Sequence, residues 1–245
     1  THFTDKAIVD IICVIDWTFL PTSMNIEEES YTKTYETLAD SVLDFAESVI
    51  KETDFELGKK IKSVGAPVDG ILEQTSKENY DMIVMGSHGK KGLQKWLGSV
   101  SREVVSNIAL PTFISKRAIT NNKVLFAVDG SQHSYNAVSE AARLLNPKEK
   151  ELYIVSVKEN PELLPLEAAL DRNWIENIDK QQKIHATKTI NKVKSILTTA
   201  DLKVNNEVIL TGNTAQKIIE YALKEEISLI IMGARSKVNL STLLL

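Results

Sequence analysis

The 245-residue sequence has one cysteine, few aromatic residues and no run of 18 apolar residues that could cross a membrane. Cys13 lies in the apolar run IVDIICVI and has no second cysteine with which to form a disulfide. We expect it to pack as a small hydrophobic residue, because no basic neighbour would lower its thiol pKa. The four histidines are scattered, and none has metal-ligand spacing to a cysteine or to another histidine. The sequence therefore predicts no disulfide scaffold, no metal site and no membrane-spanning segment.

A strong charge of one sign is also lacking. Lys and Arg number 29 and Asp and Glu number 33, which gives a net charge of −4. Since nucleic-acid-binding proteins usually carry a basic stripe, we predict no nucleic-acid partner. No secretory signal is recognisable, although the first residue is not an initiator methionine, and we expect a cytoplasmic protein.

The best-known signatures of nucleotide-dependent enzymes are missing as well. The sequence contains no GxxxxGK[ST] loop, no GxGxxG, no HxGH and no SGGxDS. His88 lies in a glycine-rich stretch but has no evident carboxylate partner that would make it an acid or base. We therefore predict no catalytic residues, and an adenylating enzyme is the least favoured interpretation.

What the sequence does contain is a long internal repeat. The stretch VGAPVDGILEQTSKENYDMIVMGSHGK from Val64 aligns with TGNTAQKIIEYALKEEISLIIMGARSK from Thr211, a separation of 147 residues. A repeat of this length is the size of a domain, so it indicates a tandem duplication rather than a solenoid. We expect two domains, residues 1–118 and residues 119–245.

Each repeat alternates apolar, β-branched runs with amphipathic runs. In the second repeat, strands are expected in KVLFAVD, ELYIVSVK, EVIL and SLIIMG, with helices in SYNAVSEAARLL, in residues 174–197 and in TAQKIIEYALKEE. The first repeat continues with a helix from Ser99 and a strand in TFISK. This βαβαβαβαβ pattern predicts an α/β fold with two doubly wound, Rossmann-like domains in tandem, each with a parallel five-stranded sheet covered on both faces.

Comparison of the two repeats predicts that each is incomplete at one end. Val124 and Val157 are 33 residues apart, whereas only 13 residues precede Val14, so about 20 residues with strand one and most of helix one are missing from the first repeat. By the same comparison, the second repeat lacks its last helix and strand. Because strand one usually lies in the centre of such a sheet, we expect the natural chain to extend beyond both ends of this sequence.

The stretch MGSHGKKGLQKWLGSVS, from Met85, joins the fourth strand of the first repeat to its last helix. Ligands of open parallel sheets bind beyond the carboxyl ends of the strands, where these residues are expected to lie. Gly86 and Gly89 would let backbone N–H groups approach an anion, while Gly98 and Ser99 stand at a helix start with free N–H groups. The same residues also have a structural explanation, with the glycines allowing a turn and Ser99 acting as an N-cap. Phosphate binding and a purely structural role both stay open.

A second turn of interest, AVDGSQHS from Ala127, ends strand one of the second repeat. Asp129 could accept a hydrogen bond from an adenine amino group or a ribose hydroxyl, or it could cap the following helix. Its place at the end of strand one favours the ligand role. His133 is expected on the surface of that helix.

These features together resemble the universal stress protein family. The resemblance is carried by the strand end VDGS, by the strand ends IVMG and IIMG, and by GSHG…GSVS opening a helix, and it covers nearly the whole chain as two tandem units. The family pattern is G-x2-G-x9-G-[S/T]. Gly89 and Gly98 enclose eight residues rather than nine, and Ser236 replaces the second glycine of the pattern in the second repeat.

The resemblance implies an adenine-nucleotide-binding regulator of the stress response, with ATP as ligand, Mg²⁺ as its accompanying ion, and little or no catalysis. It assigns the nucleotide in the first repeat to Val14, Met85, Gly86, Gly89, Gly98, Ser99, Val100 and Ser101. The weaker counterparts in the second repeat are Ala127, Val128, Asp129, Val157, Met232 and Gly233. The alternative is a nucleotide-free scaffold whose last strands pair across a two-fold axis, giving a homodimer or a pseudo-symmetric tandem monomer.

Overall fold

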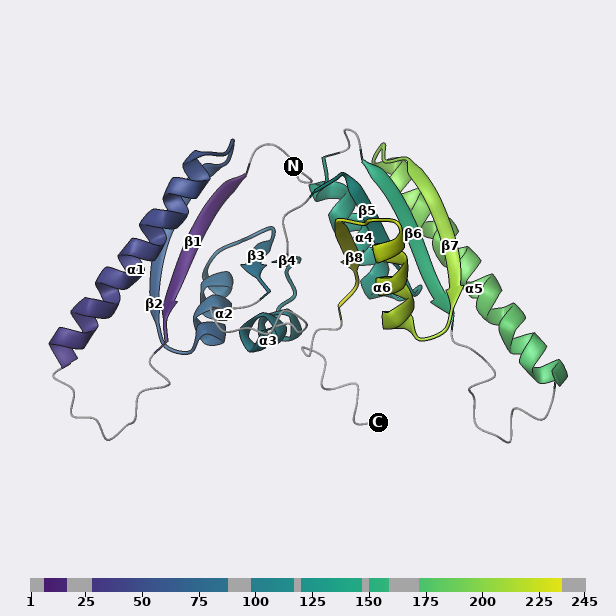
Figure 1. The fold of residues 1–245 in the computed structure, drawn as a ribbon, viewed down its shortest axis with the longest axis horizontal. Helices are drawn as coiled ribbons and strands as arrows, with labels where there is room; N and C mark the ends of the chain where they lie inside the picture. The colour runs from purple at the N-terminus through teal and green to yellow at the C-terminus, as the bar shows by residue number, and fades with distance from the viewer. Residues whose placement is uncertain are drawn as a thin grey trace. The chain divides into compact units, whose positions relative to one another are not determined.

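A computed structural model describes residues 7–16, 28–87, 98–116, 120–146, 150–158 and 172–234. Their contacts divide them into two compact units, a first unit within residues 4–116 and a second unit within residues 117–235 (Figure 1). Each unit combines parallel strands with helices, so the expected α/β class is confirmed.

The second unit contains one parallel sheet with the strand order β7-β6-β5-β8. Its strands are β5 (Lys123–Ala127), β6 (Glu151–Lys158), β7 (Val204–Thr211) and β8 (Leu229–Met232). Its helices are α4 (Gln132–Leu144), α5 (Arg172–Thr199) and α6 (Thr214–Lys224). Strand β5 pairs with both β6 and β8, which confirms that strand one of the repeat is central.

The central position of β5 follows from its sequence. Val124, Leu125 and Phe126 are fully buried, because a strand covered on both faces has no side on which to place polar residues. Val124 and Phe126 pack in one core cluster with residues of α4 and α5, and Leu125 packs in another with residues of α6. Helices therefore cover both faces of this sheet, as the doubly wound prediction requires.

The first unit has its described strands in two separate parallel pairs, β1-β2 and β3-β4. The strands are β1 (Ile8–Ile15), β2 (Glu56–Val64), β3 (Ile83–Gly86) and β4 (Thr112–Ser115). The helices are α1 (Glu28–Lys51), α2 (Pro67–Lys77) and α3 (Ser99–Asn107). By the repeat alignment, β1 and β3 are equivalent to β6 and β8, the two strands that flank β5. The described strands of the first unit are thus divided at the place of strand one. Each unit has four described strands, as expected for a first repeat without strand one and a second repeat without its last strand.

A matching turn in both units supports the alignment of the repeats. Gly65 and Gly212 both have positive φ, 134° and 132°, a conformation that glycine adopts without steric cost. The N–H of Gly65 donates to the carbonyl of Ile15, and the N–H of Gly212 donates to that of Lys158, each at 3.0 Å. The duplication therefore extends from the sequence to the backbone hydrogen bonds.

Candidate functional site

In the first unit, the end of β3 and the start of α3 are held together by a backbone hydrogen bond. The N–H of Gly98 donates to the carbonyl of Ser87 at 2.8 Å, so residues 87 and 98 lie side by side. Residues 88–97, including Gly89, lie outside the described part of the chain. Gly98 is the N-cap of α3 and Ser99 is its first helical residue, so the expectation that Ser99 is the N-cap is wrong.

A second hydrogen bond fixes the same helix start. The hydroxyl of Ser101, which is buried, donates to the carbonyl of Gly86 at 2.8 Å. Both this hydroxyl and the N–H of Gly98 therefore have partners within the fold. A sequence pattern cannot reveal such bonds, because they depend on where β3 and α3 meet.

The backbone amides of the first turn of α3 lack such partners among the described residues. The first amide to bond the preceding turn is that of Arg102, which donates to the carbonyl of Gly98 at 3.0 Å. The amides of Ser99, Val100 and Ser101 precede it, and amides at the start of a helix have no intrahelical acceptor. The first turn of α3 also has no acidic residue. The positive end of its dipole is therefore well suited to an anion.

Val14 and Met85 lie near the carboxyl ends of their strands, as predicted, but in different strand pairs. Val14 is half-buried in β1, with its methyl groups 3.1 Å from where a Cβ would stand on Gly70 of α2. Met85 is half-buried in β3 and pairs with Ile114 of β4. The neighbouring Cys13 is also half-buried, and its burial raises the pKa of its thiol, in keeping with the expected hydrophobic role.

In the second unit, the predicted residues meet at the carboxyl edge of the sheet. Ala127, the last residue of β5, pairs with Val155 of β6 on one side and with Met232 of β8 on the other. The N–H of Val128 donates to the carbonyl of Val155 at 2.9 Å, which continues the alignment beyond the strand. Val157 lies two residues farther along β6. The structure thus brings together the ends of three adjacent strands.

Asp129 follows directly at this edge and forms a local turn. Its Oδ1 accepts a hydrogen bond from the N–H of Ser131 at 2.9 Å. Burial raises the pKa of Asp129, but hydrogen bonds from Ser131 and Ser134 outweigh burial and leave the pKa below its usual value. The N-cap of α4 is Ser131, whose hydroxyl oxygen accepts from the N–H of Ser134, so Asp129 supports the cap rather than forming it. Asp129 is thus an ionised acceptor at the carboxyl edge.

His185, on α5, is a contact of this turn that sequence reasoning missed. Its Nε2 lies 3.1 Å from the carbonyl oxygen of Asp129. A Cβ on Gly130 would lie 2.6 Å from His185 Nε2 and from Thr189 Oγ1, and Gly130 has a positive φ of 83°. Helix α5 therefore packs closely against this turn. His133 is exposed on α4, as predicted.

Gly233 has a structural reason to be glycine. A Cβ at this position would lie 2.7 Å from the backbone of His133 and Ser134, closer than real Cβ contacts. The end of β8 therefore packs directly on the first turn of α4. This contact explains the glycine without any ligand.

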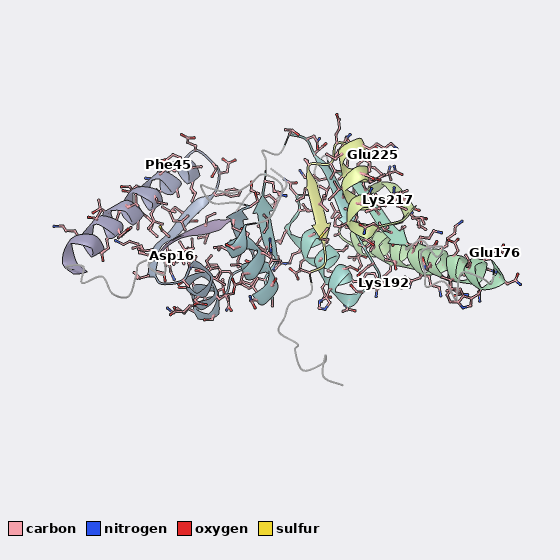
Figure 2. All side chains as sticks on the ribbon, turned by 60° about the horizontal axis from the view of Figure 1, so that its bottom comes forward. Asp16, Phe45, Glu176, Lys192, Lys217 and Glu225 are labelled. Carbon is pink, nitrogen blue, oxygen red and sulfur yellow. The ribbon has the colours of Figure 1, made fainter. Side chains whose placement is uncertain are left out.

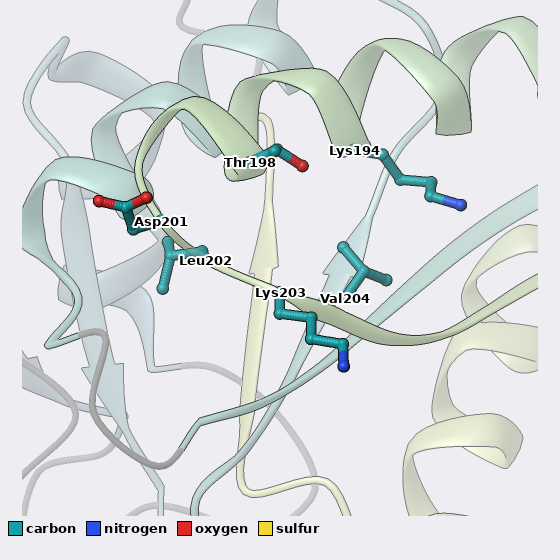
Figure 3. A pocket seen from close by; sticks show the side chains of 6 residues that line it. All are labelled: Lys194, Thr198, Asp201, Leu202, Lys203 and Val204. Carbon is teal, nitrogen blue, oxygen red and sulfur yellow. The ribbon is translucent and has the colours of Figure 1, made fainter.

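A hollow of about 300 Å³ lies elsewhere in the second unit (Figure 3). Its lining residues are Lys194, Thr198, Asp201, Leu202, Lys203 and Val204. These residues connect α5 to the amino end of β7, so the hollow lies at the opposite edge of the sheet from Asp129. The described residues contain no cluster of three metal-ligating side chains, and none of the helices they form is long and apolar enough to span a membrane.

The duplicated doubly wound units, with their turns at the carboxyl edge, define a tandem α/β protein of Rossmann-like architecture. The model of the universal stress protein family matches residues 4–116 and 120–245. The chain therefore belongs to the universal stress protein family, in a tandem form.

Individual relatives agree with this assignment. The chain is 28% identical over 149 residues to Universal stress protein MJ0531 of Methanocaldococcus jannaschii, a match that covers 59% of this chain and 85% of the relative. It is 25% identical over 196 residues to Universal stress protein Slr1230 of Synechocystis, covering 79% of this chain and 60% of the relative. The crystal structure of a universal stress protein from Archaeoglobus fulgidus has a TM-score of 0.65 at 20% identity, over 92% of this chain and 75% of that one. The similarity to the Archaeoglobus fulgidus structure supports the fold assignment.

Proposed function

We propose that the protein binds an adenine nucleotide, ATP, in its first unit and acts as a stress-response regulator with little or no catalysis. The observation that carries this proposal is the start of α3. Two hydrogen bonds fix it at the carboxyl end of β3, and the amides of its first turn have no intrahelical acceptor. The resemblance to universal stress proteins supplies the adenine nucleotide as the ligand class.

In this proposal the residues of the first unit divide into two groups. Gly98, Ser99, Val100 and Ser101 face the phosphates, together with Gly89 from outside the described residues. Ser101 contributes its backbone amide, because its hydroxyl already holds the carbonyl of Gly86. Val14, Met85 and Gly86 lie on the adenine and ribose side. Any Mg²⁺ would enter with the phosphates of the nucleotide.

The second unit is the weaker candidate for the same ligand. Ala127, Val128, Asp129, Val157, Met232 and Gly233 converge at its carboxyl edge. Asp129 offers an ionised acceptor for an adenine amino group or a ribose hydroxyl. No equivalent of α3 is present among the described residues of this unit, so the phosphates would lack their helix start.

The alternative is a nucleotide-free scaffold, and two observations favour it. The hydrogen bonds of Gly98 and Ser101, and the packing of Gly233, give these residues structural roles that need no ligand. Among the described strands, β4 is an edge strand of its sheet, which suits the pairing of last strands across a two-fold axis. The product would be a homodimer or a pseudo-symmetric tandem monomer.

Calorimetric titration with ATP separates the two proposals. The chain should bind ATP, and a double variant, Gly98→Ala with Ser99→Ala, should weaken binding by at least tenfold. Ser106→Ala, at the other end of α3, is the matched control and should bind as the unmodified chain does. Absence of binding to the unmodified chain would favour the scaffold, and unchanged binding to the double variant would move the site away from α3.

A further inference from the structure

The two long helices occupy equivalent places in the two units. Helix α1 contacts β1 and β2, and α5 contacts β6 and β7 (Figure 1). Ala39 and Leu43 of α1 are buried, and so are Ala186 and Ile190, which follow them by 147 residues in α5. Because residues of the same kind fill the same places, the buried faces alone do not assign each helix to its own strands. Exchange of such elements between related units is a characteristic folding failure of repeat proteins.

The polar contacts of the two helices differ, because one ion pair is reversed between the units. In the first unit, Glu47 of α1 pairs with Lys60 of β2, with 2.7 Å between Oε2 and Nζ. In the second unit, Lys194 of α5 pairs with Glu207 of β7, also with 2.7 Å between Nζ and Oε2. Lys194 follows Glu47 by 147 residues, and Glu207 follows Lys60 by the same interval. The acidic residue is therefore on the helix in the first unit and on the strand in the second.

Neighbouring charges extend this difference. Asp44 also pairs with Lys60, and Asp40 pairs with Lys62 at 2.9 Å. The hydrogen bond to Asp40 raises the pKa of Lys62, and the charge of Glu36 adds to this effect. Over its whole length α1 has six acidic and two basic residues, whereas α5 has two acidic and six basic residues. The long helices thus carry opposite charge, and each meets the complementary charge on its own strand.

Stability alone does not explain the reversal. The side chains of the two reversed pairs, Glu47–Lys60 and Lys194–Glu207, are 23–44% exposed. Ion pairs with this exposure contribute little to the free energy of unfolding, and either polarity contributes equally. Exchange of the helices, in contrast, would place Glu47 against Glu207 and Lys194 against Lys60. Both contacts would then change from attractive to repulsive.

We propose that the reversed pairs determine which long helix the strands of each unit accept. Asp44 and Glu47 keep α1 on the strand that carries Lys60, and Lys194 keeps α5 on the strand that carries Glu207. The partner that the pairs exclude is the long helix of the other unit, from the same chain or from a second copy. Such specificity depends on repulsion in the wrong arrangement as much as on attraction in the right one. This proposal stands independently of nucleotide binding.

A pair of cysteines can report whether α5 has packed on the wrong strand. Because Asp40 and Lys62 are in contact, Thr187, the equivalent of Asp40, would lie beside residue 62 if α5 occupied β2. The reporter is the full chain with Lys62→Cys and Thr187→Cys, and with Cys13→Ser to remove the native thiol. It is refolded from urea with oxidised glutathione, and mass spectrometry of peptides quantifies the disulfide between residues 62 and 187. The same oxidation of the already folded reporter gives the background.

Two variants of the reporter give both units the same polarity. The first transfers the residues of the second unit to the first: Asp44→Asn, Glu47→Lys, Lys51→Thr and Lys60→Glu. The second makes the opposite transfer: Asn191→Asp, Lys194→Glu, Thr198→Lys and Glu207→Lys. Each helix still meets an opposite charge on its own strand, but it now meets one on the other strand as well. The cross-linked fraction should rise about fivefold, the factor expected when two exposed pairs change sign.

The matched control combines all eight substitutions, so that the two units again differ in polarity. Its cross-linked fraction should return to that of the reporter, although it contains more changes than either variant. Because the two variants alter different units, each tests the proposal by itself. A cross-linked fraction that is the same in the reporter and in the variants would overturn the proposal. A fraction as high in the eightfold control as in the variants would also overturn it, since lost stability rather than polarity would then be the cause.

Discussion

Phe45 of α1 and Lys192 of α5 occupy equivalent positions 147 residues apart, and Lys192 contacts an aromatic ring of the neighbouring helix α4. Lys192 Nζ lies 3.8 Å from the centre of the Tyr135 ring, whereas Phe45 is 71% exposed (Figure 2). The two units are therefore built on one pattern but differ in which surfaces are complete. The same difference appears at the candidate site. The structure describes the end of strand one in the second unit, and it describes the start of α3 in the first unit.

The two faces of α1 should respond differently to truncation. Leu43→Ala removes a side chain that is only 2% exposed, so it should lower the free energy of unfolding by about 2–4 kcal/mol. Phe45→Ala, two residues away on the exposed face, should change it by less than about 0.5 kcal/mol. Urea unfolding followed by circular dichroism measures both. A large loss for Phe45→Ala would mean that this side chain is covered in the isolated chain.

Gly233→Ala should destabilise the second unit. The added methyl group would lie 2.7 Å from the backbone of His133 and Ser134, and backbone cannot move aside as a flexible side chain can. We expect a loss of about 1–3 kcal/mol in the free energy of unfolding, the usual range for overpacking. Ala234→Ser, at the neighbouring exposed position, is the control and should be nearly neutral. Equal stability of Gly233→Ala and the unmodified chain would contradict the packing explanation.

Ser101→Ala should lower the stability of the first unit without changing its fold. The substitution removes the partly buried hydrogen bond to the carbonyl of Gly86, a loss of about 0.5–1.5 kcal/mol. Ser101→Thr keeps the hydroxyl and is the conservative comparison. Urea unfolding compares the two, and a loss confined to Ser101→Ala is the expected result. Indistinguishable stabilities of Ser101→Ala and the unmodified chain would mean that the bond contributes nothing.

The free energy of unfolding at acid pH should depend on Glu47. Hydrogen bonds from Lys51 and Lys60 lower the pKa of Glu47 from 4.5 to about 2. Because the folded pKa lies below the unfolded one, this stabilisation is fully present above pH 4.5 and is lost as the pH falls toward 2. Glu47→Gln should therefore flatten the decline of stability over this range. Glu52→Gln, for which no ion pair is seen among the described residues, is the control. An unchanged slope of stability against pH for Glu47→Gln would contradict the link between Glu47 ionisation and stability.

The sequence predicted the strands and helices well because burial on two faces leaves a clear pattern. The run VLF in β5 has no polar position, as expected for a strand with both faces covered, and the usual topology of doubly wound sheets places this strand in the centre. The alternation of elements then predicts the doubly wound arrangement of the second unit. The comparison of the repeats predicted that strand one is missing from the first unit, and its described strands form two separate pairs.

The irregular pairing at the start of β1 and β6 was not predictable. The register shifts between Val9 and Ile11, where Asp10 accepts a hydrogen bond from the N–H of Lys59 at 2.7 Å. It shifts again between Leu152 and Tyr153 in the second unit, at the equivalent place. Such a shift depends on two strands about fifty residues apart meeting in a particular alignment, which no local pattern encodes.

For the candidate site, the sequence indicated which residues lie at the carboxyl ends of the strands but not the hydrogen bonds that they form. The glycines and serines around α3 suggested an open cradle, yet Gly98 and Ser101 each use a donor within the fold. The contact of His185 with Asp129 was missed because the two residues are 56 positions apart and no motif connects them. Tertiary contacts therefore decide which donors a ligand can reach.

An ATP titration followed by amide chemical shifts tests the central claim, nucleotide binding at the start of α3, most directly. We predict that the amide signals of Ser99, Val100 and Ser101 shift with a single dissociation constant and move farther than those of Ala127, Asp129 and Gly233. Shifts confined to the second unit, or no shifts at saturating ATP, would contradict the account.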